Sequence, residues 1–353
     1  MNSSFVSIII ATFNSERLLP KVLAAVKKQT YPKDKIEILI IDGESKDKTL
    51  KIAKEFGCKV LNNPRTEPVY GKFLGYLNAK GQYIMYLDHD EVMENVDSIN
   101  IKMKAFKKNA QIKAVAGSGY KNPNGYPFIN SYINEFGDPF SFFIYKLSKD
   151  ANFFSQTMKE RYPIFLENKF FAAFDLSKIK SLPIIELVAG GSMFDATTLK
   201  KEYPQTLKRY ELLPHYFYLL HSKYPFIAIT KNDALIHYSA DNLKKYLNKI
   251  KWRVKNNIYH VSDMGESGFS GRNKFQPSLL RLKKYLFIPY AYSLILPLLD
   301  SISLMISRRK PLYLLHLPLT VYTATLIIYH YFLRISGKKP VLRSYDESKE
   351  IKI

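Results

Sequence analysis

Cysteine is nearly absent from this sequence of 353 residues, since Cys58 is the only one. An intramolecular disulfide is therefore excluded, which suits a reducing compartment. The fold must rest on an apolar core, and apolar residues make up 46% of the chain. The sequence also lacks a secretory signal, because the apolar run at residues 5–11 is too short and has no basic segment before it.

Acidic residues are scarce relative to basic ones: 31 Asp and Glu stand against 53 Lys and Arg, for a formal charge of +22. Such an excess favours a polyanionic partner, whether nucleic acid, an anionic lipid surface or a phosphorylated substrate. Basic and apolar residues interleave over residues 244–255, as in an amphipathic helix on anionic lipid, and a solvated helix face has the same pattern. Apolar stretches downstream favour the lipid surface, so we expect no nucleic-acid partner.

The first 120 residues alternate short β-branched runs with helical patterns, which is typical of βαβ units. Strands are expected at residues 6–10, 36–41, 59–61 and 83–87, with helices at 16–29, 47–56 and 69–79. Regular structure is expected again at 186–194, with helices from Thr197 and at 209–223 and strands at 226–229 and 235–237. This order predicts a Rossmann-related α/β catalytic domain over residues 1–240, with a mostly parallel sheet that binds ligands beyond its strands' carboxyl ends.

Residues 120–185 lack a clear period and are rich in aromatic residues, proline and asparagine. We expect an irregular insertion there, which is either an acceptor-binding region or a structural flap. Asp138 lies within it and could contact an acceptor, although a Gly-Asp-Pro turn explains the same residues.

Two apolar stretches, residues 286–306 and 312–333, are each long enough to cross a bilayer core. We expect a spanning hairpin or a half-embedded pair over 285–335, after a basic juxtamembrane segment at 241–284 and before a charged tail at 336–353. Basic residues at both outer ends favour a cytosolic location for both, and hence for the catalytic domain. Two core helices of a soluble protein are the alternative.

Two carboxylates, Asp88 and Asp90, follow the expected strand at 83–87. Residues two apart in an extended backbone can project to the same side, here at the edge where a parallel sheet binds its ligand. Hard oxygen ligands suit Mg²⁺ or Mn²⁺, which can bridge to phosphate oxygens. Asp-x-Asp is frequent by chance in solvated turns, but the strand before it favours a metal site.

Short polar side chains also follow the first two expected strands, at residues 11–16 and 42–47. They precede helices, so ordinary N-cap chemistry explains several of them. Asp42 is different, because a carboxylate at the end of an apolar strand can accept from a ribose hydroxyl or a base N–H.

Together these segments resemble family 2 glycosyltransferases of the GT-A fold. The resemblance rests on VSIIIATFNSE at 6–16, IIDGESKDKT at 40–49, and Gly75 with AKGQYIMYLDHD at 79–90. It covers residues 5–120 well and 185–240 loosely. It implies that nucleotide-sugar is bound by Thr12, Asn14, Asp42 and Asp88, with Glu16 as a helper. It also implies that Asp88 and Asp90 hold the metal and the diphosphate.

The resemblance implies further roles late in the domain. The family's acidic pair on a late helix is broken here, because Leu212 follows Glu211, which leaves Glu211 as the candidate general base or a helix-dipole partner. His237 stands where some GT-A enzymes have another metal ligand, although a histidine at a strand end is often structural. Gly190 and Gly191 could let the backbone approach donor or acceptor, or could form a simple turn.

The resemblance implies an inverting, metal-dependent transfer of a sugar from a nucleotide-diphosphate donor. The apolar stretches favour a lipid-linked or polyprenyl-phosphate acceptor at the cytosolic membrane face. Two other classes of protein remain open. A nucleotidyltransferase uses a similar sheet, but it normally has a glycine-rich loop after its first strand, and residues 11–17 contain no glycine. The second alternative is a non-catalytic membrane protein that binds a nucleotide-sugar, but it does not explain why acids stand at the strand ends.

Overall fold

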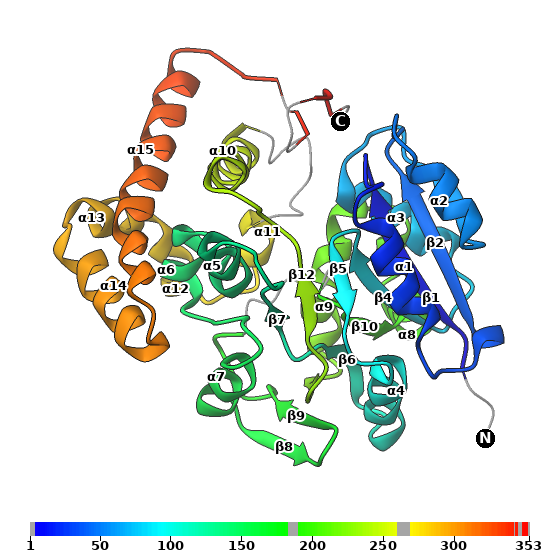
Figure 1. Cartoon of the computed structure of the whole chain (residues 1–353). Coiled ribbons are helices and arrows are strands. Elements are labelled where there is room, and N and C mark those ends of the chain that lie inside the picture. Colours follow the sequence, from blue (N-terminus) through cyan, green and yellow to red (C-terminus); the bar gives the residue numbers. More distant parts are fainter. Residues whose placement is uncertain (1–3, 183–189, 260–268, 342, 345–347, 352–353) are drawn as a thin grey trace.

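A nine-stranded sheet forms the centre of the protein (Figure 1). The structure is a computed structural model that describes residues 4–182, 190–259, 269–341, 343–344 and 348–351. In spatial order the strands are β3 (Lys59–Asn62), β2 (Ile36–Asp42), β1 (Val6–Thr12), β4 (Tyr83–Asp88), β10 (Met193–Asp195), β6 (Ile112–Ala116), β11 (Phe226–Thr230), β9 (Phe171–Asp175) and β8 (Ile164–Glu167). The α/β class and mostly parallel sheet predicted from the sequence are confirmed.

The register of the parallel strands sets their carboxyl ends level with one another. Thr12 of β1 lies beside Asp42 of β2, and Ala11 lies beside Asp88 of β4. The continuous apolar runs of β1 and β2 explain this arrangement, because a strand covered on both faces needs apolar residues at every position. The strand-end residues singled out from the sequence therefore meet at one edge of the sheet.

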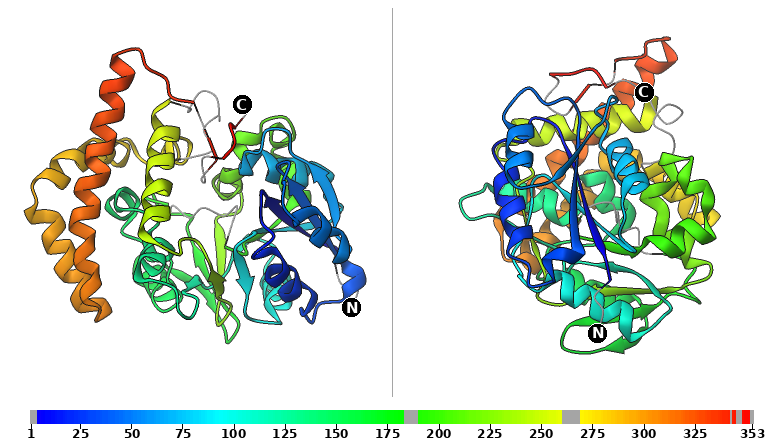
Figure 2. Two further views of the ribbon diagram at one scale, coloured as in Figure 1. Left: turned by 45° about the horizontal axis from the view of Figure 1, so that its top comes forward. Right: turned by 90° about the vertical axis from the view of Figure 1, so that its right-hand side faces the viewer.

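Helices cover both faces of the sheet (Figure 2). On one face, the core contains residues of α1 (Leu19–Lys27), α2 (Thr49–Glu55) and α4 (Ser98–Lys108). On the other, it contains residues of α3 (Pro68–Asn78), α7 (Phe154–Arg161) and α9 (Tyr216–His221), with α8 (Ala196–Glu202) beside them. Successive side chains of β1 point to opposite faces of the sheet. Ile8 and Ile10 pack in the core with α1, α2 and α4, and Ile9 packs in the core with α3, α7 and α9.

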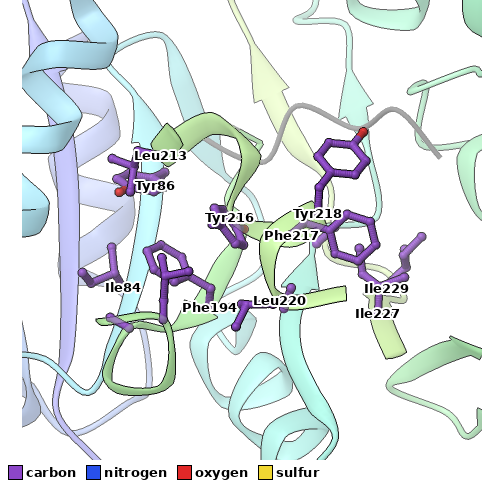
Figure 3. Packing of buried hydrophobic residues seen from close by; sticks show 14 of the residues in the cluster. Ile84, Tyr86, Phe194, Leu213, Tyr216, Phe217, Tyr218, Leu220, Ile227 and Ile229 are labelled. Carbon is purple, nitrogen blue, oxygen red and sulfur yellow. The ribbon is translucent and has the colours of Figure 1, made fainter. Parts of the chain in front are cut away.

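Aromatic rings fill the core with α3, α7 and α9 at the point where the antiparallel strand β10 enters the sheet (Figure 3). Phe194 of β10 stacks between Tyr86, with ring centroids 5.6 Å apart, and Tyr216, at 4.2 Å. The expected helix at 209–223 is divided here into a 3-10 segment, Tyr210–His215, and α9, because Pro214 interrupts the α-helical pattern. Of the regular structure expected at 186–194, residues 186–189 lie outside the described residues.

A small sheet lies beyond the end of β4, with β12 (Leu235–His237) between β5 (Glu91–Met93) and β7 (Tyr120–Lys121). His237 pairs with Glu91 across the antiparallel β12–β5 ladder. This pairing brings the last expected strand of the domain next to the Asp88–Glu91 turn.

The expectation of an irregular insertion at 120–185 is wrong. The segment forms α5 (Phe128–Phe136), α6 (Pro139–Tyr145) and α7, followed by the hairpin β8–β9 that extends the main sheet. In α5 every residue from 129 to 136 is buried. Its sequence has the period of an amphipathic helix, with Ile129, Tyr132, Ile133 and Phe136 on one face, and the fold buries the polar face as well.

The basic segment forms α10 (Leu243–Tyr259), and its apolar face packs on protein. Tyr246, Ile250, Val254 and Ile258, four residues apart, are buried against α5 and against α15 (His316–Ile335). The prediction that this apolar face lies on lipid is therefore wrong. The short helices α11 (Phe269–Asn273) and α12 (Ser278–Leu282) follow.

The first apolar stretch is not one straight span. It forms α13 (Phe287–Tyr292) and α14 (Ile295–Arg308), and the helical segments Ser278–Tyr292 and Ile295–Arg308 meet at an angle of 90°. Leu294, at the bend, has a φ of 56°. The second stretch is helical over Pro311–Ile335 and is long and apolar enough to cross a membrane. Within the described chain, length and composition allow one membrane span, or two if the bent pair counts as one.

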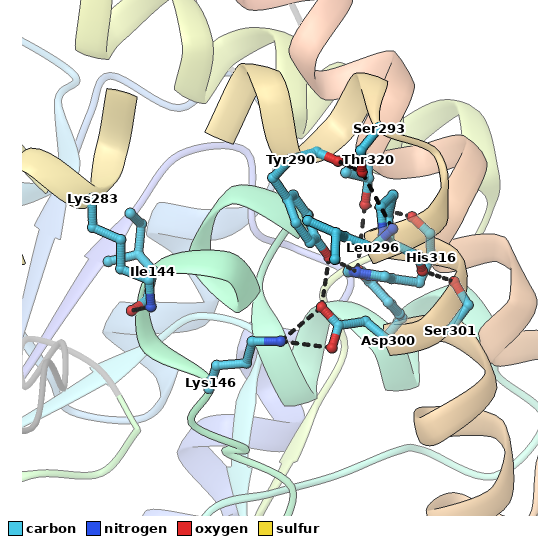
Figure 4. Close-up of polar contacts among 12 residues, drawn as sticks. Ile144, Lys146, Lys283, Tyr290, Ser293, Leu296, Asp300, Ser301, His316 and Thr320 are labelled. Atoms are coloured by element: carbon cyan, nitrogen blue, oxygen red, sulfur yellow. Dashed lines mark hydrogen bonds and ion pairs between the residues drawn. The ribbon is translucent and has the colours of Figure 1, made fainter. Parts of the chain in front are cut away.

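Polar groups of the apolar stretches find partners in the insertion (Figure 4). Lys146 Nζ lies 2.7 Å from both carboxylate oxygens of Asp300 on α14, and Tyr290 Oη donates to Asp300 at 2.8 Å. His316 lies 2.6 Å from Tyr132 Oη through Nδ1. These contacts, with the packing of α15 on α6 and α10, join the C-terminal helices to the α/β domain.

The charged tail after α15 returns toward the sheet (Figure 1). Lys349 Nζ donates to the Gly43 carbonyl at 2.9 Å and lies 2.7 Å from Glu44 Oε2, in the loop after β2. Trp252 Nε1 of α10 donates to the Arg343 carbonyl at 2.6 Å. The tail therefore bridges α10 and the strand-end loops.

Candidate active site

One pocket of about 1300 Å³ lies beyond the carboxyl ends of β1 and β4 and reaches α10 and α15. Its wall includes six of the residues predicted from the sequence: Thr12, Asn14, Asp88, Asp90, Asp138 and His237. Within the described residues, its wall does not include the other five: Glu16, Asp42, Gly190, Gly191 and Glu211.

Asp42 is buried at the end of β2, where it ties two strands together. Its carboxylate accepts from Thr12 Oγ1 at 2.9 Å, from the Ser45 backbone N–H at 2.8 Å and from Ser45 Oγ at 2.6 Å. Thr12 in turn lines the pocket. In this structure Asp42 therefore shapes the pocket through Thr12 and the turn at Ser45.

Asn14 and Glu16 join the loops that follow β1 and β2. The Asn14 side-chain oxygen accepts from the Lys46 N–H at 2.9 Å, and Glu16 Oε2 accepts from the Lys48 N–H at 3.0 Å. Asn14 has a φ of 46°, a left-handed conformation that asparagine tolerates better than most residues. The two loops are thus held as one rigid edge of the pocket.

Asp88 ends β4 and is paired with a lysine that sequence reasoning missed. Lys72 Nζ, buried on α3, donates to Asp88 Oδ1. A signal existed in the expected helix at 69–79, because Lys72 shares the apolar stripe of Val69, Phe73 and Tyr76. A lysine on the buried face of a helix needs a carboxylate partner, and Asp88 supplies it.

Asp90 and His237 face each other across the pocket wall. His237 Nε2 lies 3.6 Å from Asp90 Oδ1, and the His237 ring packs on Tyr120 with centroids 4.6 Å apart. Burial alone would raise the pKa of Asp90, but His237, with His89 and Lys249, holds that pKa below its usual range. His237 Nδ1 is buried, and none of the described residues forms a hydrogen bond with it.

The donors at this edge of the pocket suit a divalent cation that is shared with a ligand. Among the described residues, no three His, Cys, Asp or Glu side chains converge as a complete metal centre. Asp90, His237 and Asp88 nonetheless line one pocket, and His237 Nε2, which faces Asp90 Oδ1, adds a nitrogen donor. A cation here would take its remaining ligands from phosphate oxygens, as Mg²⁺ commonly does.

Glu91, directly after Asp90, is a second residue whose place sequence reasoning did not assign. It is buried and accepts from Tyr120 Oη at 2.7 Å, from the Gly190 N–H at 2.9 Å and from the Asp88 N–H at 3.0 Å. Burial, and then the charge of Asp88, raise the pKa of Glu91 to about 7, although His237 and the Tyr120 hydrogen bond oppose this. Glu91 fixes the backbone of the Asp88–Asp90 turn from behind.

Gly190 and Gly191 have φ values of 69° and 61°, in the region that favours glycine. A Cβ on Gly190 would lie 3.2 Å from Tyr120 Oη, so glycine permits the contact that holds Glu91. Glu211 lies elsewhere: its carboxylate pairs with Arg209 Nε at 2.7 Å. The structure does not bring the predicted base together with Asp88 and Asp90.

Cations of α10 face the acids across the pocket. Lys249 lies beside Asp90, and burial lowers the pKa of Lys249 to about 8, although Asp90 opposes this. Arg253, one turn further on, lies 2.9 Å from Asp138 Oδ2. Asp138 also accepts from the Ser141 N–H at 2.7 Å, so it is the N-cap of α6 as well as part of the pocket wall. The sequence placed these cations on a helix, and only the fold turned them to the pocket.

A mostly parallel sheet in which β10 and β9 run antiparallel to their neighbours, with acids at its strand ends lining a pocket, is the arrangement of the GT-A fold. Residues 7–159, less than half of the sequence, match the family "Glycosyl transferase family 2".

Two archaeal relatives illustrate the likeness in sequence. A dolichyl N-acetyl-alpha-D-glucosaminyl phosphate 3-beta-D-2,3-diacetamido-2,3-dideoxy-beta-D-glucuronosyltransferase of Methanococcus voltae is 36% identical over 108 residues, which cover 27% of this chain and 34% of the relative. Glycosyltransferase AglE of Haloferax volcanii is 35% identical over 92 residues, 24% of this chain and 30% of the relative. The likeness thus spans about a third of each relative.

A solved structure extends the likeness over most of the chain. The mannosyltransferase PcManGT of Pyrobaculum calidifontis, in complex with GDP-Man and Mn²⁺, superposes with a TM-score of 0.56 over 93% of this chain and 88% of that one. At 13% sequence identity, this likeness shows a shared fold.

Proposed function

We propose that this protein is an inverting, metal-dependent glycosyltransferase that moves a sugar from a nucleotide-diphosphate donor to a lipid-linked or polyprenyl-phosphate acceptor, at the cytosolic face of a membrane. One observation carries the proposal. Asp88 and Asp90 line the same pocket as Thr12, Asn14 and the α10 cations, which supports placing the proposed nucleotide, metal and acceptor sites in one pocket.

The donor half of the pocket is rigid before any ligand arrives. Asp42, Asn14 and Glu16 hold the loops after β1 and β2, and Glu91 holds the turn after β4. A bound Mg²⁺ or Mn²⁺ would stabilise the negative charge of the leaving diphosphate. Asp90, Asp88 and His237 are its proposed ligands, and Lys72 keeps Asp88 oriented by pairing with one of its oxygens.

The acceptor half favours a phosphate as the attacking group. The Methanococcus voltae relative is named for a dolichyl-linked phosphate, and the +22 formal charge of this chain suits an anionic acceptor. A phosphate oxygen is already ionised near neutral pH, so it attacks the anomeric carbon without a general base. The position of Glu211 outside the pocket wall is consistent with such an acceptor.

Exposed apolar side chains on α12 to α15 support attachment to a membrane. More than half of each of these side chains is exposed: Leu279, Leu282, Tyr285, Leu286, Leu294, Ile295, Leu296, Leu299, Ile306, Leu312, Tyr329, Phe332 and Ile335. Of these helices, α13, α14 and α15 lie together at the side of the molecule opposite α2 and β2 (Figures 1 and 2). An apolar surface of this extent on a soluble domain marks a membrane or protein contact, and the bend at Leu294 favours half-embedded helices.

The direct test is transfer from nucleotide-diphosphate sugars to farnesyl phosphate in mild detergent with Mn²⁺, scored by a radiolabelled lipid product. Donor specificity would first be screened by thermal shift with UDP- and GDP-sugars. If no nucleotide sugar raises the melting temperature with Mn²⁺ present, the proposal fails. A nucleotidyltransferase would instead release diphosphate from a nucleoside triphosphate, and a binding protein would bind donor without forming product.

Asp42→Asn is expected to weaken nucleotide binding by about 1–3 kcal/mol. The amide places an N–H₂ group where the carboxylate accepts from Thr12 and Ser45, so the loop loses its anchor. Calorimetric titration with UDP and GDP in Mn²⁺ measures the loss. Asp175→Asn is the control, because Asp175 also ends a strand but lies outside the pocket wall. Equal nucleotide affinity in both variants would remove Asp42 from the donor site.

Glu211→Gln is expected to retain turnover within about threefold, because a phosphate acceptor needs no general base. A drop of about 100- to 10,000-fold in turnover, with donor affinity unchanged, would identify Glu211 as the base for a hydroxyl acceptor. Steady-state kinetics at saturating donor separate these outcomes.

A further inference from the structure

The pocket does not end at the acids: it continues into an apolar chamber. The chamber wall comes from α6, α10, α11, α13 and α15 and includes Phe140, Ile258, Phe269, Ile288, Ile327 and Phe332. Pockets for one small ligand usually enclose about 300–1,000 Å³. At about 1300 Å³, this pocket has room for a donor and a second ligand that is largely apolar.

α10 runs along the pocket, and the residues that it contributes to the wall change from cationic to apolar along its length. Lys245, Lys249 and Arg253 recur every four residues, so they project from one side of the helix, and all three line the pocket. One position further on, Ile250, Val254 and Ile258 form the adjoining apolar row, which also lines it. Lys249 lies at the Asp90 end and Ile258 nearer α15, so the wall passes from cationic to apolar.

The two inner cations are held in place by neighbours. Lys249 Nζ donates to Ser239 Oγ at 2.8 Å, two residues beyond His237. Arg253 Nη1 is fixed by Asp138, which sets the guanidinium in the pocket wall, where such a group can bind a phosphate oxygen by charge-assisted hydrogen bonds. Because Asp138 neutralises part of this charge, Lys249 and Arg253 together are required for a strong anion site.

The far end of the chamber opens at the second half of α15. Ile328, Tyr331, Phe332 and Ile335 line the pocket and are 45%, 48%, 66% and 84% exposed. These residues belong to the helices that carry the exposed apolar surface of α12 to α15. An apolar chain could therefore enter the chamber from the acyl region of a membrane without crossing water.

We propose that this pocket binds a single-chain lipid phosphate, with its phosphate between Lys249 and Arg253 and its chain in the apolar chamber, beside the pocket-lining residues of α13 and α15. The inference rests on the proposed function, which it deepens by assigning residues to the acceptor. The acceptor phosphate would lie on the Asp90 side of α10, near the place where donor and metal are expected. The cation row binds the phosphate whether the lipid carries one phosphate or two.

Binding of the lipid phosphate can be measured without any donor, because Trp252 is the only tryptophan of the chain and lines the pocket. Trp252 fluorescence would be titrated with farnesyl phosphate, farnesol and inorganic phosphate below the micelle concentration. We expect farnesyl phosphate to bind at least tenfold more tightly than either of the others. Inorganic phosphate or farnesol binding equally well would overturn the two-part site.

Variants locate the phosphate. Lys249→Met and Arg253→Met are each expected to raise the dissociation constant for farnesyl phosphate by about 10- to 100-fold, the loss of a charge-assisted hydrogen bond. Arg253→Lys should recover part of the loss. Lys244→Met, which makes the same charge change at an exposed position of α10 outside the pocket wall, should stay within about twofold.

Two separate readouts distinguish this inference from the proposed function. Calorimetric binding of nucleotide sugars tests the donor site, and Arg253→Met and Lys244→Met should match the parent in it, which also shows that they are folded. Because Lys249 lies beside Asp90, the fold of Lys249→Met is checked by far-UV circular dichroism instead. Equal farnesyl phosphate affinity in Lys249→Met, Arg253→Met and Lys244→Met would overturn the assignment of the phosphate site while leaving the donor site intact. Failure of the parent to bind any nucleotide sugar would instead remove the proposed function.

Discussion

Asp90→Asn is expected to lower the rate of sugar transfer by about 1,000-fold, and Asp88→Asn by a similar factor. The metal's contribution to the departing diphosphate amounts to several kcal/mol, and each 1.36 kcal/mol corresponds to a tenfold change in rate. Asp90 is suited to this role because it lies in the pocket wall with His237 and its carboxylate stays ionised. Initial rates with saturating donor, acceptor and Mn²⁺ measure the effect.

Asp34→Asn provides the matched control, since Asp34 is an exposed acid outside the pocket wall. It should transfer sugar at the parent rate, and far-UV circular dichroism should be the same for all three variants. The parent enzyme should lose activity in EDTA and regain it with Mn²⁺ or Mg²⁺. Full activity of Asp90→Asn, or of the parent in EDTA, would rule out the metal assignment.

A triple variant with Ile295, Leu299 and Ile306 changed to Glu is expected to detach the protein from membranes. These side chains on α14 are 66%, 57% and 67% exposed, so the changes leave the packed core intact. Full burial of one such side chain in an apolar medium is worth about 1.5–3 kcal/mol. Losing three lowers the membrane partition coefficient by about 1,000-fold or more, as vesicle co-sedimentation would measure.

A second surface provides the comparison. Leu77→Glu with Val96→Glu changes exposed apolar residues outside the C-terminal helices, and this variant should sediment with vesicles like the parent. The parent should also stay bound in 1 M salt, because screening weakens charge attraction but not apolar burial. If the parent is monodisperse without detergent and ignores vesicles, the exposed surface serves a protein contact instead.

The donor side of the site could be predicted from sequence because its signals are local. A continuous apolar run such as residues 6–10, in a chain that alternates strands and helices, predicts a strand buried on both faces of a sheet. The residue that follows such a strand then lies at the edge of the sheet where ligands bind. Asp42, Asp88 and Asp90 were found in this way. The roles of Lys72, Glu91 and Lys249 were not predicted, because the residues that they contact come near them only when the chain folds.

The C-terminal half shows where local reasoning fails. Residues 120–185 appeared irregular because the partners of α5 and α6 lie more than 100 residues away, on α10, α14 and α15. The apolar stretches resembled independent membrane spans for the same reason. Their polar residues, Asp300 and His316, bind Lys146 and Tyr132, so these helices complete the core of the insertion while leaving one surface exposed.

The sequence by itself determined the parallel sheet, the edge at which the acids stand and the excess of positive charge, because hydrophobic period and strand-end position act over a few residues. Only the tertiary structure decided which side chains meet. It turned Asp42 toward Ser45, set Asp90 against His237, left Glu211 outside the pocket wall and directed α10 inward. These outcomes depend on contacts between segments that are distant in the sequence, and such contacts form and stabilise the fold only when the chain packs.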